Sequence, residues 1–128
     1  ARPFVKGATM MNNALFAVTI DCADAAALAR FWADVLGRQV AAAPTSEHAV
    51  LLAGGGETSE PCIVFNKVPE AKIVKNRLHL DLISDTFDDE SERLLGLGAR
   101  RLRDQQSGNS RWTTFADIEG NEFDLIAG

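Results

Sequence analysis

The chain has 128 residues, 46% hydrophobic and 24% charged, which is typical of one globular domain. Its net charge of −5 argues against nucleic acid and anionic membranes as partners, because both bind a cationic surface. No apolar run approaches the roughly 18 residues of a membrane span. The two cysteines make no disulfide framework, so we expect a cytoplasmic protein.

The first half predicts a strand, a helix and three further strands. Residues 1–13 show no periodicity and are interpreted as an N-terminal extension, whereas 15–21 is rich in apolar and β-branched residues and predicts a strand. Asp24 can cap a helix that Gly37 ends. The apolar face of this helix comprises Leu28, Phe31, Trp32, Val35 and Leu36. Strands are then predicted at 38–42, 48–53 and 61–66, with a glycine turn at 54–56.

The same order of elements restarts after a polar connector at 67–76. A strand is predicted at 77–84, followed by a helix that Asp85 or Thr86 caps and Gly98 ends. Its acidic first turn suits the positive end of the helix dipole. The remaining strands are predicted at 100–102, 111–116 and 122–126.

The two halves also share a register. Ala17 and Cys62 are 45 positions apart, and so are His79 and Asp124. In a fold of two similar halves, these four side chains would surround one centre.

Strand alternation separates core residues from a polar face. Phe16 and Leu78 are expected in the core with the other alternating apolar residues of their strands. The opposite face then carries Ala17, Thr19 and Asp21 in the first half, and His79, Asp81 and Asp124 in the second. Such a polar face is either open to solvent or the lining of a cavity.

Four segments carry a resemblance to a known superfamily. They are VTIDCAD at 18–24 leading to FWADVLG at 31–37, DIEGNEF at 117–123, VPEAK at 68–72 and KNRLHLDL at 75–82. In these segments the chain resembles the vicinal oxygen chelate superfamily of glyoxalases, bleomycin-resistance proteins and extradiol dioxygenases. It is most similar to a subgroup of single-domain glyoxalase-like proteins.

The resemblance implies an α+β fold. Two pseudo-symmetric βαβββ modules would form an eight-stranded half-open cup within one domain at 14–127. Module 1 would span about 14–67 and module 2 about 77–127. Members of the superfamily commonly dimerise, so a homodimer is expected.

Enzymes of the superfamily hold a divalent metal in the cup, and the resemblance places its ligands at Ala17, Cys62, His79 and Asp124. His79 and Asp124 suit a metal, whereas Ala17 cannot bind one. A metal would therefore have to use His79, Asp124 and Cys62, although Cys62 also suits a small buried hydrophobe. We expect no cofactor, with a divalent metal as the alternative.

Two functions are compatible with this pattern, and whether the protein is an enzyme stays open. The first is metal-free binding of a small molecule in the cup, as in bleomycin-resistance proteins. The alternative is a lyase or isomerase with His79 as acid or base and Asp124 as its partner, with or without a divalent metal. A structural His–Asp pair is the plainer interpretation of the same residues. The expected ligand-lining residues are Ala17, Thr19, Cys62, Asp81 and Trp112.

Overall fold

The computed structural model describes residues 15–54 and 60–128, and the expected extension at 1–13 lies outside this part. Within it the α+β class is confirmed, with seven strands and two helices. In chain order these are β1 (Ala17–Cys22), α1 (Ala25–Leu36), β2 (His48–Leu51), β3 (Cys62–Lys67), β4 (Leu80–Ser84), α2 (Phe87–Leu97), β5 (Arg100–Ser107), β6 (Ser110–Ala116) and β7 (Glu122–Ala127).

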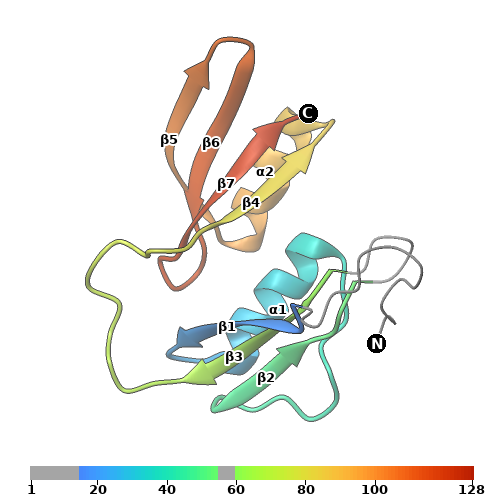
Figure 1. Cartoon of the computed structure of the whole chain (residues 1–128), viewed down its shortest axis with the longest axis vertical. Coiled ribbons are helices and arrows are strands. Elements are labelled where there is room, and N and C mark those ends of the chain that lie inside the picture. The colour runs from blue at the N-terminus through green and yellow to red at the C-terminus, as the bar shows by residue number, and fades with distance from the viewer. Residues whose placement is uncertain (1–14, 55–59) are drawn as a thin grey trace, which may run out of the picture.

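The strands form two sheets, one in each half of the chain. The first has the order β1-β3-β2 and the second β4-β7-β6-β5. In each sheet the first and last strands of the half pair in parallel, β1 with β3 and β4 with β7, and the other pairs are antiparallel. Figure 1 shows the two sheets one above the other, joined by the connector between β3 and β4. The first and fourth strands, β1 and β4, are therefore edge strands.

The strand expected at 38–42 is reduced to a single bridge between Val40 and Leu51. Two backbone hydrogen bonds flank this bridge, from the Leu52 amide to the Gln39 carbonyl and from the Ala41 amide to the Val50 carbonyl. Ala43 then has a φ of 61°, which bends the chain away from β2. The pairing with β2 therefore stops after this bridge.

Both predicted ends of α1 are confirmed. The side chain of Asp24 accepts a hydrogen bond from the Ala27 amide at 3.2 Å, and Gly37 follows the helix with a φ of 65°. Thr86 precedes α2 without a side-chain cap, and Gly98 ends that helix with a φ of 113°. Glycine tolerates this left-handed backbone, in which a Cβ would be strained.

One apolar core is shared by the two halves. Trp32 of α1 is 1% exposed and packs edge-on against Phe123 of β7, with 4.8 Å between ring centroids. Its indole N–H donates to the buried carboxylate of Asp117 at 3.0 Å. The prediction that Phe16 and Leu78 are core residues is wrong, because they are 76% and 65% exposed. Both lie just outside the strands that start at Ala17 and Leu80.

Module 2 supplies side chains to both ends of α1. The carboxylate of Glu119 accepts hydrogen bonds from the amides of Ala23 and Asp24 at 2.7 and 2.9 Å. At the other end, Arg93 of α2 donates to the carbonyls of Asp34 and Val35, both at 2.9 Å. An anion thus lies at the positive end of the helix and a cation at its negative end. We call these two contacts the inter-module caps.

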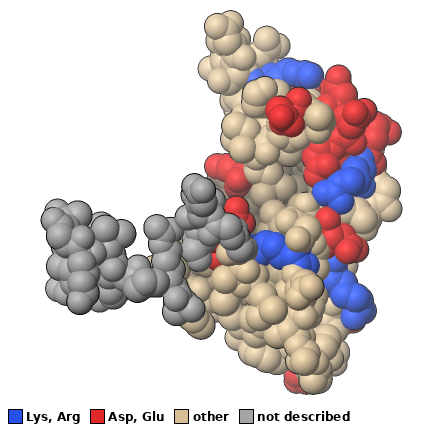
Figure 2. All heavy atoms as spheres, turned by 90° about the vertical axis from the view of Figure 1, so that its right-hand side faces the viewer, with Lys and Arg blue, Asp and Glu red and all other residues tan. Residues whose placement is uncertain are grey.

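The acidic charge is unevenly distributed over the surface. Figure 2 shows acidic side chains gathered on the upper half of one face, the half that holds module 2. The first turn of α2 contributes Asp88, Asp89 and Glu90 to this half. Among the described residues, no helix has the length and hydropathy required to cross a membrane.

Candidate functional site

The register of module 2 differs from the one that the sequence suggested. Ala17 lies opposite Cys62 in module 1, 45 positions along the chain. In module 2, however, Asp124 lies opposite Asp81, 43 positions away, and not opposite His79. The register expected from the symmetry of the two halves is therefore wrong by two residues. Because side chains alternate with a period of two, His79 stays on the same face, and Asp81 joins it beside Asp124.

His79 directly precedes β4 and is held in place through Asn76. The Asn76 amide accepts a hydrogen bond from the Glu122 amide at 3.2 Å and donates to the Glu122 carbonyl at 3.3 Å. The Asn76 side chain thus bonds the backbone amide and carbonyl of Glu122, with which a residue before β4 could otherwise have paired. These two bonds tie the approach to β4 onto the sheet, and His79 follows three residues later.

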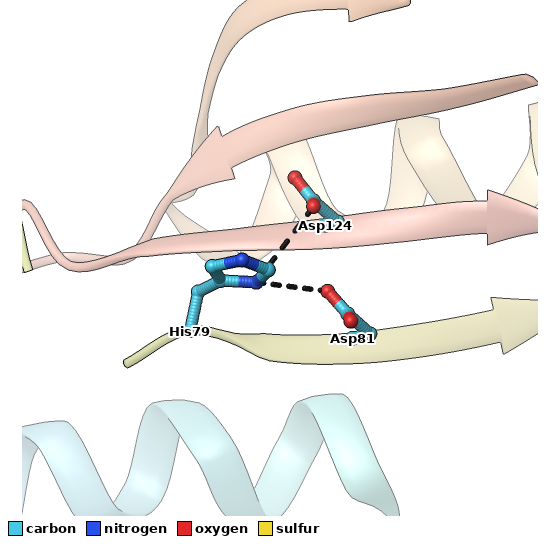
Figure 3. Close-up of side chains that lie close together, drawn as sticks. All are labelled: His79, Asp81 and Asp124. Carbon is cyan, nitrogen blue, oxygen red and sulfur yellow. Dashed lines mark hydrogen bonds and ion pairs between the residues drawn. The ribbon is translucent and has the colours of Figure 1, made fainter. Parts of the chain in front are cut away.

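The centre of the site is one imidazole between two carboxylates (Figure 3). The Nδ1 atom of His79 lies 2.9 Å from Oδ1 of Asp81 and 3.8 Å from Oδ2 of Asp124. The side chains of His79 and Asp81 are about half exposed, at 45% and 50%, whereas that of Asp124 is 19% exposed. The predicted pair of His79 and Asp124 is thus brought together, with Asp81 as the nearer carboxylate.

This contact determines the tautomer of the imidazole. A carboxylate is only an acceptor, so the Nδ1 atom of His79 must carry the proton in the hydrogen bond to Asp81. In the neutral ring the Nε2 atom then keeps its lone pair. His79 can therefore offer Nε2 as a hydrogen-bond acceptor, a general base or a metal ligand.

Sequence reasoning missed Thr114 of β6, which lies opposite Asp124 in the sheet. Its hydroxyl donates to Oδ1 of Asp124 at 2.6 Å. Strand alternation from Asp124 through the antiparallel partner strand could have identified it, had the register between β6 and β7 been predictable.

Glu122 is a third carboxylate near His79, and both residues border the same cavity. The Arg103 guanidinium lies 3.0 Å and the Lys75 ammonium 3.6 Å from its Oε1 atom. The hydrogen bond from Arg103 is the main cause that lowers the pKa of Glu122 below its usual value, and the nearby charge of Lys75 lowers it further. Glu122 is therefore a charged partner of two cations, and it is not available as an acid near neutral pH.

Two cavities lie along the gap between the edge strands β1 and β4. One of about 370 Å³ is bordered by Thr19, Trp32 and His79. The other, of about 540 Å³, is bordered by Val18, Leu80 and Asp81 with further apolar side chains. Both volumes fall in the range of small-molecule sites. His79 and Asp81 thus border cavities whose walls are largely apolar.

The other predicted ligand-lining residues are spread more widely. Ala17 and Cys62 lie opposite each other in module 1, and both are partly buried. Trp112 is on β6 opposite Ile126, one repeat beyond Thr114. It borders a third hollow beside α2, where His79 is not among the lining residues. Of the five, Asp81 is the residue that forms a hydrogen bond with His79, and Thr19 borders the same cavity as His79.

The donors for a metal ion also differ from the expected set. Among the described residues, one group could hold an ion: His79, Asp81 and Asp124, with ligand atoms within 4.8 Å of one another. Cys62 is not a member. The His79 atom nearest both carboxylates is Nδ1, so an ion held by all three residues would take the place of the Nδ1 proton and of the hydrogen bond to Asp81. One imidazole and two carboxylates suit an ion such as Mn²⁺.

Comparisons with known proteins agree with this architecture. The profile of the glyoxalase-like domain matches residues 17–126. A glyoxalase/bleomycin resistance protein/dioxygenase family enzyme from Burkholderia phytofirmans is similar in structure, with a TM-score of 0.71 at 20% identity, over 90% of this chain and 98% of that one. No curated protein matches the chain in sequence.

Two further solved structures are similar to the chain. One is a mutant of the fosfomycin resistance protein FosX of Listeria monocytogenes, complexed with Mn(II) and a dihydroxypropylphosphonic acid. Its TM-score is 0.72 at 17% identity, over 93% of this chain and 92% of that one. The other is lactoylglutathione lyase from Agrobacterium tumefaciens, with a TM-score of 0.63 at 15% identity, over 91% and 94%. At these identities the likeness establishes the fold.

Proposed function

The chain belongs to the glyoxalase-like domain family, and from this premise we propose that it binds a small molecule at the gap between β1 and β4. One observation carries the proposal, the His79 imidazole that two carboxylates hold beside two cavities. The walls are largely apolar, and His79 gives the site its central polar contact. A largely apolar wall with a few polar groups is usual in small-molecule sites.

His79 would act through its Nε2 atom. Asp81 fixes the proton on Nδ1, so the lone pair of Nε2 is free to accept a hydrogen bond from a hydroxyl or an acidic group of the ligand. The same arrangement can take a proton from a bound molecule, because the carboxylates stabilise the imidazolium that forms. Binding needs only the first of these roles, and an enzyme would use both.

The proposal is tested by the binding of a small-molecule fragment library, followed through backbone amide shifts in NMR. We expect fragments to shift amides of β1 and β4, and His79→Ala to abolish these shifts while it changes the free energy of unfolding by less than about 1.5 kcal/mol. His48→Ala is the matched control, because His48 is exposed on β2 and bonds to Asn66. Fragments that bind His79→Ala unchanged would contradict the proposal.

The group of three donors favours a second candidate, a metal-dependent lyase or isomerase. His79, Asp81 and Asp124 would hold the ion, and the metal would supply Lewis-acid stabilisation of negative charge on an oxygen. A similar FosX structure contains Mn(II). Elemental analysis and Mn²⁺ titration followed by EPR test this candidate. We expect Asp81→Asn to weaken binding and Cys62→Ser to leave it unchanged, and no Mn²⁺ binding by the wild-type protein would exclude Mn²⁺ at this site.

We also propose that the protein acts in the cytoplasm as a homodimer. The resemblance to a superfamily whose members commonly dimerise supports the dimer. Light scattering coupled to size-exclusion chromatography would give the mass directly. A monomer at micromolar concentration would refute the dimer without affecting the binding proposal.

A further inference from the structure

Thr114 has a buried hydroxyl that forms a hydrogen bond with a residue of the site. The side chain of Thr114 lies in β6, and the residue is 3% exposed. Its Oγ1 atom donates to Oδ1 of Asp124 at 2.6 Å, and it accepts a hydrogen bond from Nε2 of Gln105 at 3.2 Å. These contacts run across the sheet from β5 through β6 to β7, and then to His79.

The direction of this chain of hydrogen bonds follows from the chemistry of its members. The amide nitrogen of Gln105 is only a donor, so Thr114 must accept from it. The single hydroxyl proton of Thr114 is then left for Asp124, whose ionised carboxylate is only an acceptor. Gln105 therefore orients the Thr114 hydroxyl toward Asp124.

The bond to Thr114 also orients the carboxylate. With Oδ1 of Asp124 engaged by the hydroxyl, Oδ2 is the atom that faces His79, at 3.8 Å. Asp81 lies opposite Asp124 in the sheet and repels its carboxylate, and the bond to Thr114 holds the Asp124 carboxylate in place against this repulsion. The side chain of Asp124 is 19% exposed, and a carboxylate with so little access to water needs a hydrogen-bond donor within the protein.

We propose that Thr114 is a positioning residue of the site, which holds Asp124 toward His79, and that Gln105 sets the direction of its hydroxyl. The role rests on the proposed function, because it concerns the same imidazole. Thr114 itself does not contact His79, and its effect is transmitted through Asp124.

The strand offers a matched control in the adjacent residue. Thr113 is 1% exposed, and its hydroxyl also donates to an aspartate oxygen at 2.6 Å, that of Asp104. Because neighbours in a strand point to opposite faces, this bond lies on the side of the sheet away from Asp124. Thr113→Val and Thr114→Val thus remove the same group from the same strand at similar burial.

The test compares the imidazole signals of the unliganded variants by ¹H–¹³C and ¹⁵N NMR. The chain has two histidines, so His48 serves as an internal reference. We expect Thr114→Val to shift and broaden the His79 signals, Thr114→Ser to restore them, and Thr113→Val to leave them unchanged. If Thr114→Val and Thr113→Val leave the His79 signals alike, the positioning role is refuted and Thr114 is a packing residue.

Titration with Mn²⁺ alone gives a second readout. Residues that orient a metal ligand typically change metal affinity about 10–100-fold, so a loss of about tenfold is expected for Thr114→Val and none for Thr113→Val. Equal affinities in the two variants would count against the proposal. Where no variant binds Mn²⁺, the imidazole signals still decide it. They need no ligand, so failure of the positioning role is distinguishable from failure of the binding function.

Discussion

Replacement of Glu119 should loosen the first helix from the second module. The carboxylate accepts two amide hydrogen bonds at the start of α1, at 2.7 and 2.9 Å. Hydrogen bonds to a charged group contribute about 1.5–3 kcal/mol each, but these amides are near solvent and water replaces part of the loss. We therefore expect about 1 kcal/mol for each, or about 2 kcal/mol of unfolding free energy lost in Glu119→Ala. Glu119→Gln keeps one acceptor oxygen and should lose about half as much.

The measurement is urea unfolding followed by circular dichroism, with linear extrapolation to water. A loss of about 2 kcal/mol corresponds to a decrease in Tm of roughly 8 °C for a chain of this size. Glu92→Ala is the control, because Glu92 is exposed on α2 and its side chain has no hydrogen bond or ion pair within the described ranges. If Glu119→Ala changes stability by less than about 0.5 kcal/mol, the bonds to α1 do not stabilise the fold as argued.

Two further predictions concern the helix ends and a buried thiol. In urea unfolding we expect Gly98→Ala to lower the free energy of unfolding by at least about 2 kcal/mol and Gly37→Ala by about 1 kcal/mol. Both glycines have a positive φ, but a Cβ at Gly98 would in addition lie 3.0 Å from the Ile118 side chain. Equal losses in the two variants would contradict the predicted effect of this close contact. Burial first, and then the carboxylates of Glu119, Asp24 and Asp21, raise the pKa of the Cys22 thiol to about 11. In a Cys62→Ser variant we therefore expect iodoacetamide at pH 8 to label Cys22 only after unfolding, as read by mass spectrometry, and rapid labelling of the folded protein would disprove this protection.

The strongest local signals in the sequence predicted structure well. Asp24 and Gly37 bracket α1 as expected, because a cap and a left-handed stop depend on a few neighbouring residues. The strand expected at 38–42 failed for the opposite reason. The pairing ends near Ala43, whose positive φ is rare for a residue other than glycine and is not signalled by the residue types of this segment.

The site was predicted in part. The side chains of His79 and Asp124 lie 3.8 Å apart, because a register shift of two residues leaves each of them on its face of the sheet. The partner of Asp124 was misjudged, since equal spacing in the two halves suggested equal pairing. In the structure the Asn76 side chain bonds the backbone of Glu122 just before the part of β7 that pairs with β4 begins, a contact that equal spacing in the two halves cannot predict. Thr114 was missed because its role depends on a neighbouring strand.

The inter-module caps have a consequence for synthesis on the ribosome. Chains emerge from the N-terminus, so α1 is made long before the residues that complete its ends. Arg93 follows Asp34 by 59 positions, and Glu119 follows Asp24 by 95. The dependence runs one way, since α2 ends in its own Gly98 and takes neither cap from module 1. The half of the protein that is translated first therefore cannot reach its final form until nearly the whole chain has been made.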